Sequence, residues 1–225
     1  MNNGILISIE GPDTSGKSTQ AQLLKETLEA YGRTVEILHF PNDESPYGKL
    51  IRQLLTNKEG ELTYDQAYAM QLLYVADQQA KQDYILSQLK NGVDIIIDRY
   101  DLSTMVYTAV TLGMTKKGRR FVEDPGSAFS MVSNLQTELI KPDFTIVLTL
   151  PAEEIKKRKD ELDRFESNEF LMSQVAHLYE LIGTQDRYLF TRPIIHVNAK
   201  QSVEEVQAQI MKCLELKHKL KEILH

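Results

Sequence analysis

The sequence predicts an α/β protein in which a five-stranded parallel sheet is flanked by helices on both faces. Two observations lead to this fold class. Short apolar runs of strand length alternate along the chain with longer stretches of helical periodicity. Within each short run the apolar character is nearly continuous, which is typical of parallel strands buried on both faces. The 225 residues show no break in composition, so a single domain over residues 1–225 is expected.

The first half of the chain supplies two strands and two helices. Residues 5–9, Ile-Leu-Ile-Ser-Ile, are the first expected strand, and residues 34–38 are the second. A helix is expected from residue 17 to about residue 31, because four residues there share one helical face: Leu23, Leu24, Thr27 and Leu28. A long helix is expected from about residue 64 to residue 90, where Asn and Gly end it.

The second half supplies three strands, a final helix and two loops. The strands are expected at residues 93–97, 144–148 and 193–197, which are rich in Ile and Val. The final helix is indicated by apolar residues at helical spacing: Val203, Val206, Ile210, Leu214 and Leu220. Residues 113–126, which contain four basic side chains, and residues 156–169, of which 10 of 14 are charged, are expected to be mobile loops.

Composition excludes several classes of protein. The hydrophobic fraction of 42% and the charged fraction of 26% are ordinary for a globular chain. No apolar run approaches the roughly 18 residues that span a bilayer, and no signal peptide is recognisable, so we expect no membrane association. The single cysteine, Cys213, excludes an internal disulfide and favours a reducing cytoplasm. The net charge of −6 argues against a nucleic-acid-binding surface.

The strongest motif is Gly-Pro-Asp-Thr-Ser-Gly-Lys-Ser at residues 11–18, which matches the phosphate-binding pattern G-x-x-x-x-G-K-[ST]. A strand precedes it and a helix follows it, as the motif requires; a chance Gly/Lys turn is the alternative. Amide groups at the helix start favour a bound phosphate. Lys17 would reach the β- and γ-phosphates and Ser18 would bind Mg²⁺. The predicted nucleoside triphosphate site comprises Gly11, Pro12, Asp13, Thr14, Ser15, Gly16, Lys17, Ser18 and Thr19.

The third expected strand ends in Asp98-Arg99-Tyr100. An acid at the carboxyl end of a buried parallel strand lies near the phosphate loop, where Asp98 can organise Mg²⁺. Arg99 can neutralise charge on the transferred phosphoryl group or on an anionic acceptor. A solvated strand end is the alternative for this triplet taken alone.

The motifs in their order resemble those of the thymidylate kinases, a family of P-loop nucleoside monophosphate kinases. The resemblance spans roughly residues 4–210, and its specificity lies in the order and spacing of motifs that are weak singly. They are the P-loop with its acid Asp13, Phe40-Pro41, Gly48-Lys49-Leu50, Leu72-Leu73-Tyr74, Asp98-Arg99-Tyr100 with Ser103, Lys141-Pro142-Asp143, Asp163-Arg164-Phe165-Glu166 and Val197-Asn198-Ala199-Lys200.

The resemblance implies a three-layer P-loop kinase fold with residues 156–169 as a lid. It implies ATP-dependent phosphorylation of a deoxypyrimidine monophosphate, dTMP to dTDP, with Mg²⁺, in nucleotide biosynthesis, by a homodimer. Implied catalytic residues are Lys17, Asp98, Arg99 and Arg164, with Ser18 and Asp98 at the metal. Arg158, Asn198, Ala199 and Lys200 would contact ATP. The implied acceptor site comprises Asp13, Phe40, Pro41, Arg52, Tyr74, Gln78, Arg99, Ser103, Tyr107 and Phe165.

Several of these residues also have plainer interpretations. Tyr74 and Tyr107 lie in apolar helical patterns, where a core position would explain each of them without a ligand. The charged segment at residues 156–169 would ordinarily be a solvated loop, although a mobile lid that excludes water from the phosphates fits better beside a P-loop. We assign no chemistry to His39.

Two positions depart from the family pattern. Asp43 stands where the family often has an arginine that grips the acceptor phosphate, and Gln78 stands where a second arginine is usual. Two lost contacts to a phosphate would cost about 1.5–3 kcal/mol each. Arg99, Arg52, and Arg119 and Arg120 in the loop at residues 113–126 could compensate. Gln78 could read a pyrimidine edge. The alternatives are therefore a deoxynucleoside or modified-nucleotide kinase, or a non-catalytic ATP-binding relative.

Overall fold

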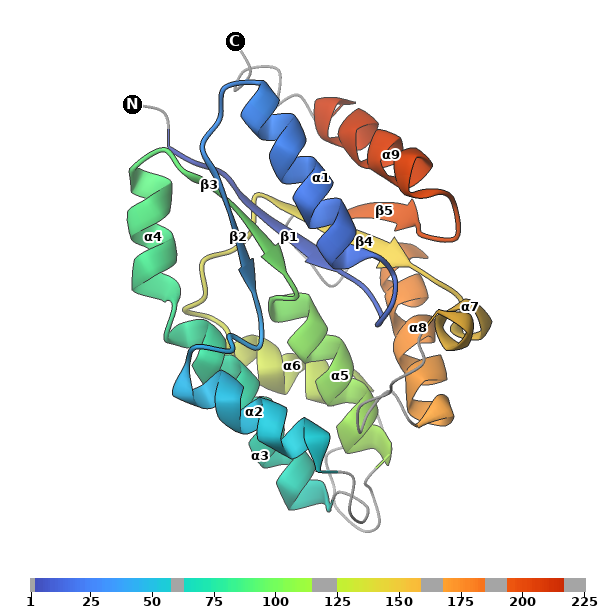
Figure 1. Ribbon diagram of the computed structural model, residues 1–225. Helices are drawn as coiled ribbons and strands as arrows, with labels where there is room; N and C mark the ends of the chain where they lie inside the picture. Colours follow the sequence, from blue (N-terminus) through green and yellow to red (C-terminus); the bar gives the residue numbers. More distant parts are fainter. Residues whose placement is uncertain (1–2, 58–62, 115–124, 159–167, 185–193, 217–225) are drawn as a thin grey trace.

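The computed structural model describes residues 3–57, 63–114, 125–158, 168–184 and 194–216. Five parallel strands form one sheet in the order β2-β3-β1-β4-β5, as Figure 1 shows. Their bounds are Leu6–Glu10 for β1, Val35–His39 for β2, Asp94–Asp98 for β3, Phe144–Thr149 for β4 and Ile194–Asn198 for β5. The expected fold class, an α/β protein with a five-stranded parallel sheet, is confirmed.

Helices cover both faces of this sheet (Figure 1). One face carries α1 and α9, which pack on each other and on strands β1, β2, β3 and β5; the other carries α4 against β3 and α8 against β4. Helices α2, α3, α5 and α6 pack on one another and lie beyond the carboxyl ends of the strands. The helices are α1 Lys17–Ala30, α2 Pro46–Thr56, α3 Tyr64–Gln79, α4 Gln82–Lys90, α5 Asp101–Met114, α6 Pro125–Leu135, α7 Ala152–Lys157, α8 Glu169–Thr184 and α9 Val203–Leu216.

The strands extend one residue beyond the expected ranges at their carboxyl ends. The expectation ended each strand with its apolar run, but the parallel pairing continues through one polar residue in every strand: Glu10, His39, Asp98, Thr149 and Asn198. Because all the strands are parallel, these polar side chains gather along a single edge of the sheet. The apolar residues before them are buried in β1, β3, β4 and β5 and partly buried in β2, so the hydrophobic core positions the site.

The expected long helix at residues 64–90 is wrong, because the chain turns at Ala80 and Lys81 and forms two helices, α3 and α4. The carbonyl of Gln78 accepts from the side-chain Nε2 of Gln82 at 2.8 Å and from the backbone N–H of Lys81 at 3.2 Å. These two donors replace the backbone bond from residue 82 that would continue an α-helix. Gln82 in turn bonds the Tyr100 hydroxyl and the Ile140 amide.

Three further expectations need correction at their ends. The loop expected at 113–126 is shorter, since α5 includes Gly113 and Met114 and α6 begins at Pro125; its four basic residues lie outside the described residues. Residues 156 and 157 of the expected lid belong to α7, and residue 169 begins α8. In the final helix Val206, Ile210 and Leu214 are buried as expected, but Val203 in the first turn is 45% exposed and Leu220 lies outside the described residues.

No helix among the described residues is long and apolar enough to cross a membrane.

A buried ion pair holds the amino-terminal edge of the sheet. The Asp94 carboxylate accepts from the Arg33 guanidinium at 2.7 and 2.5 Å and from the Ile5 amide at 2.9 Å. The Asp94 side chain is fully buried, whereas the side chain of Arg33 is 14% exposed. Within the described part of the chain, Arg33 is the cation that pairs with this carboxylate. The pair ties β1, β2 and β3 together at the end of the sheet opposite the site.

We predict that Arg33→Met lowers the free energy of unfolding by about 3 kcal/mol, because the substitution leaves Asp94 buried and without its cation. Lys25→Met is the matched control: it removes a cation from the exposed Lys25–Glu29 pair, whose charged atoms are 3.5 Å apart, and should cost less than about 0.5 kcal/mol. Urea denaturation of the two variants checks this difference. Equal losses would contradict the role given to Asp94.

Candidate active site

The phosphate loop connects β1 to α1 at the carboxyl edge of the sheet. Gly11 and Gly16 have φ values of +148° and +90°, which side-chain-bearing residues rarely adopt. A Cβ on Gly11 would lie 2.5 Å from the Leu148 carbonyl oxygen, so only glycine lets the loop lie this close to β4. The Lys17 ammonium donates to the Pro12 carbonyl at 2.7 Å, across the mouth of the loop.

Lys17 is charged only over a limited pH range. Burial and, to a smaller extent, the nearby positive charge of Arg99 together lower its pKa from 10.5 to about 8. The carboxylates of Asp13, Asp98 and Glu10 act in the opposite direction. An incoming phosphate would add negative charge and stabilise the ammonium form.

Asp98 at the end of β3 forms the second part of the site. Its Oδ2 accepts from the Ser18 hydroxyl at 2.6 Å and lies 3.5 Å from Nδ1 of His39. Burial opposes ionisation of Asp98, but His39, Lys17, Arg99 and Ser18 together outweigh it and lower its pKa to about 2. Its other oxygen, Oδ1, is buried and has no hydrogen-bond partner in the described part of the chain.

This ionised carboxylate beside a hydroxyl fits Mg²⁺. Mg²⁺ keeps most of its waters and is usually held by one or two protein oxygens together with substrate phosphates. Ser18 and Asp98 offer such a pair, and the buried Oδ1 of Asp98 still lacks a partner among the described residues. These two residues therefore fit the role of metal ligands that the sequence suggested.

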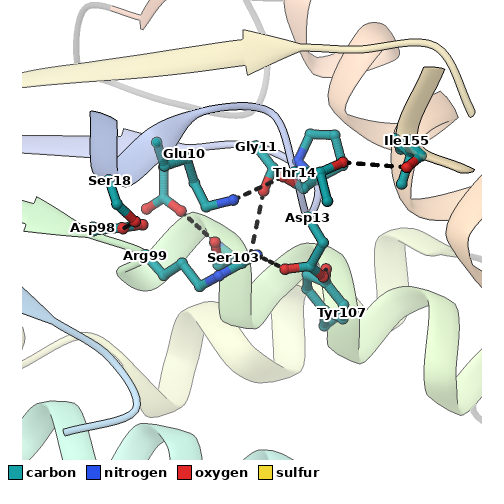
Figure 2. Close-up of polar contacts among 12 residues, drawn as sticks. Glu10, Gly11, Asp13, Thr14, Ser18, Asp98, Arg99, Ser103, Tyr107 and Ile155 are labelled. Atoms are coloured by element: carbon teal, nitrogen blue, oxygen red, sulfur yellow. Dashed lines mark hydrogen bonds and ion pairs between the residues drawn. The ribbon is translucent and has the colours of Figure 1, made fainter. Parts of the chain in front are cut away.

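Arg99 lies where β1 and β3 meet the phosphate loop. Its φ of +66° is unusual for a side-chain-bearing residue and turns the guanidinium back over the loop. There it is paired with the Asp13 carboxylate and donates to the Gly11 carbonyl, as Figure 2 shows. The Tyr107 hydroxyl donates to the other oxygen of Asp13 at 2.7 Å. Burial would lower the pKa of Arg99, but the Asp13 carboxylate raises that pKa well above its ordinary value.

Glu10 is a functional residue that the sequence reasoning missed. This fully buried carboxylate accepts from the amides of Tyr100 and Ser103 at 3.0 and 3.1 Å. It also accepts from the Ser103 hydroxyl at 2.5 Å, a contact drawn in Figure 2. It thereby fixes the turn between β3 and α5, which presents Arg99. A charged residue that closes an apolar strand immediately before Gly11 was the available signal.

Most of the predicted site residues line one cavity of about 650 Å³. These are Asp13, Thr14, Gly16, Lys17, Ser18, Thr19, Phe40, Pro41, Arg52, Tyr74, Gln78, Asp98, Arg99, Ser103, Tyr107 and Arg158. Gly11, Pro12 and Ser15 complete the phosphate loop behind that lining. Arg158 also donates to the Ala199 carbonyl at 3.1 Å, which brings it to the predicted adenine segment of Asn198, Ala199 and Lys200. Arg164 and Phe165 lie outside the described residues.

The cavity extends from the phosphate loop to a region lined by aromatic and amide side chains. Phe40 is buried and stacks on Tyr100, with ring centroids 6.0 Å apart. Tyr74 is half-buried and lines the cavity beside Gln78 and the hydroxyl-bearing Thr104. Tyr74 also packs against the core, so its position is compatible with both interpretations weighed from the sequence.

The departure at Asp43 has a structural explanation. Asp43 accepts from Nε of Arg52 at 2.7 Å, and Nη2 of Arg52 lies 3.3 Å from Nε2 of His39. The Arg52 side chain is thus held at the cavity wall by an acid on one side and a histidine on the other. His39, which received no role from the sequence, connects Arg52 to Asp98.

The fold and the site together define a P-loop nucleotide kinase: a phosphate loop, an acid on the adjacent strand, and an aromatic region in the same cavity. A family model described as thymidylate kinase matches residues 9–210, and the chain belongs to that family of nucleoside monophosphate kinases.

Individual relatives agree with the family match. The thymidylate kinase of Dictyostelium discoideum is 29% identical over 209 residues, which cover 92% of this chain and 83% of that protein. That of Arabidopsis thaliana is 29% identical over 216 residues, covering 92% of this chain and 69% of the relative. The structure of a Candida albicans thymidylate kinase with broad substrate specificity superposes with a TM-score of 0.73 at 30% identity, covering 96% of this chain and 92% of the other.

We predict that nucleotide affinity falls as Lys17 loses its proton. The Kd for ADP, measured calorimetrically without divalent cations, should rise about tenfold between pH 7 and pH 9, because binding above the pKa of about 8 must first recapture a proton. Lys17→Arg stays charged over this range and should remove most of the rise. A pH-independent Kd in the parent protein would show that Lys17 does not meet the phosphates.

Proposed function

We propose that this protein transfers the γ-phosphate of ATP to dTMP and so produces dTDP and ADP. One observation carries the proposal: a single cavity connects the phosphate loop to an aromatic pocket, and Arg99 lies where the two meet. An oxygen of the acceptor phosphate would attack the γ-phosphorus in line, and the bond from that phosphorus to the β,γ-bridging oxygen would break.

The donor half of the cavity would hold the ATP phosphates. The backbone amides of the loop and of the start of α1 would donate to the phosphates, and Lys17 would move from the Pro12 carbonyl onto the phosphates. Ser18 and Asp98 would hold Mg²⁺, which when bound neutralises charge on the phosphates. Arg158 would lie against the adenosine, since it already contacts Thr14 and Ala199.

The acceptor half would bind the deoxynucleotide. Phe40 and Tyr74 offer aromatic surface for the base, and Arg52 and Arg99 offer cations for its phosphate. Asp13 would accept from the 3′-hydroxyl of the sugar, and Tyr107, bonded to Asp13, would occupy the space of a 2′-hydroxyl. Ser103 would act indirectly, because its hydroxyl is bonded to Glu10 and Tyr179.

A deoxynucleoside acceptor is the second candidate, and one observation favours it. The cation available on α2, Arg52, already has a carboxylate partner in Asp43, so it offers less net charge to a monophosphate than an arginine at position 43 would. An acceptor phosphate would have to compete with Asp43 for Arg52. Because the side chains of Asp43 and Arg52 are 66% and 44% exposed, their ion pair is worth little in water, and a dianionic phosphate can displace Asp43.

The remaining features of the proposal rest on the family resemblance. Arg164 and Phe165 would act from a lid within the single domain, and two copies would pair through helices beside the sheet. The apolar side chains of Tyr47, Leu50 and Leu72, on α2 and α3, are 38–42% exposed and suit such a contact. A cytoplasmic location fits a chain with one cysteine.

We predict that dTMP is phosphorylated with a higher kcat/KM than thymidine, dGMP or dUMP, and that Arg52→Gln raises the KM for dTMP about tenfold while leaving the KM for ATP unchanged. Loss of one charge-assisted contact to the phosphate accounts for that size. Coupled measurement of ADP release checks both statements. Lys49→Gln is the matched control, since Lys49 is an exposed cation of the same helix that does not line the cavity.

Faster turnover of thymidine than of dTMP would transfer the assignment to the deoxynucleoside candidate. ATP binding without phosphoryl transfer to any acceptor would contradict enzymatic activity altogether.

A further inference from the structure

Three buried polar side chains form a chain of hydrogen bonds at the aromatic end of the cavity. Gln136, which follows α6, donates from Nε2 to Oε1 of Gln78 at 3.3 Å. Gln78 on α3 donates from its own Nε2 to the Thr104 hydroxyl on α5 at 3.0 Å. Gln78 and Gln136 are 1% exposed and Thr104 is 3% exposed. Gln78 and Thr104 line the cavity, whereas Gln136 lies behind Gln78.

The backbone fixes the direction of this chain at both ends. Nε2 of Gln136 also donates to the Asp101 carbonyl at 3.2 Å, and a carbonyl can only accept, so Gln136 must turn its amino group that way. The same amino group faces Gln78, which must therefore present its oxygen to Gln136. At the other end, the Thr104 hydroxyl donates to the Tyr100 carbonyl and accepts from Gln78. The Gln78 amide thus has one orientation.

The oriented amide keeps hydrogen-bonding capacity for a ligand. Nε2 carries two hydrogens, and Thr104 accepts one of them; Oε1 has two lone pairs, and Gln136 uses one. Contacts within the described residues leave one donor and one acceptor of this side chain unused. An almost fully buried amide at a cavity wall beside two aromatic residues is suited to the polar edge of a flat heterocycle.

We propose that Gln136 and Thr104 lock Gln78 in the orientation that selects a 4-keto pyrimidine. The inference rests on the proposed function and adds the determinant of base selectivity. The edge of thymine or uracil offers an acceptor at O4 and a donor at N3, which match the amide N–H and the amide oxygen. Cytosine offers the reverse, a donor at its 4-amino group and an acceptor at N3. Its amino group would then face the amide N–H of Gln78, and its N3 would face the amide oxygen, so neither hydrogen bond could form.

The lock is what turns this contact into selectivity. A glutamine that can rotate its amide by 180° satisfies either edge, because its two ends exchange places. Held by Gln136 and Thr104, the amide can satisfy only one edge without breaking buried hydrogen bonds. Gln78 is then the base-contacting residue, and Gln136 is a positioning residue that acts through it.

The test is the ratio of kcat/KM for dTMP to that for dCMP in the full-length protein. The parent should favour dTMP by at least about 10³-fold, as expected of a buried site built around specific hydrogen bonds. Gln136→Leu should lower this ratio at least about tenfold, mainly by improving dCMP, because Gln78 is then free to rotate. The KM for ATP should not change, and calorimetric binding of dTMP and dCMP without ATP should show the same loss of discrimination.

Gln20→Leu is the matched control for general damage. It removes another buried amide, on α1, which donates to the Val203 carbonyl at 3.0 Å and does not line the cavity. Thermal unfolding of both variants establishes that each is folded, and Gln136→Met provides a second substitution should leucine pack badly. Gln20→Leu should leave the dTMP to dCMP ratio within about twofold of the parent.

An unchanged ratio in folded Gln136→Leu and Gln136→Met would overturn the inference while leaving the dTMP kinase activity intact. Equal loss of selectivity in Gln20→Leu would overturn it as well, because the effect would then be general. Failure of the parent to phosphorylate any pyrimidine monophosphate would instead overturn the proposed function, and this inference with it.

Discussion

The ion pair between Arg99 and Asp13 is the contact on which the rest of the site depends. It joins the phosphate loop after β1 to the turn after β3, and it balances a guanidinium that would otherwise lie unpaired beside the ammonium of Lys17. Arg99 already lowers the pKa of Lys17, so loss of Asp13 would increase the repulsion between two buried cations. Tyr107 and Glu10 hold the two sides of this pair in place.

The acceptor side differs from the family pattern, yet its charges are organised. Asp43, Arg52, His39 and Asp98 form a continuous series of contacts from the exposed loop before α2 to the predicted metal site. The carboxylate of Asp77 supports that loop by accepting from the Asn42 amide and the Ser45 hydroxyl. Arg52 on α2 thus presents a cation to the cavity, and the acid at position 43 orients it.

The sequence was sufficient for what contiguous residues determine. The parallel sheet, the phosphate loop and the Asp98-Arg99 pair follow from apolar runs and short motifs. Contacts between residues that are distant in the sequence could not be predicted from it. The division between α3 and α4 depends on a side chain, Gln82, that competes for a carbonyl, and no helical periodicity records such competition. Gln136 lies 58 residues from Gln78, and only packing brings their amides together. From the sequence, the acid at position 43 indicated a lost contact to the acceptor phosphate. Its pairing with Arg52 could not be seen there, because the fold brings these two side chains together.

The central claim is that one cavity binds both nucleotides with their phosphates meeting at Arg99. A compound in which adenosine and thymidine are joined 5′ to 5′ through a short chain of phosphates tests it directly. Calorimetric titration should show one molecule bound per chain, more tightly than ATP or dTMP alone, and each of those nucleotides should displace it. Displacement by ATP but not by dTMP would contradict the account, because the thymidine end would then lie outside the cavity.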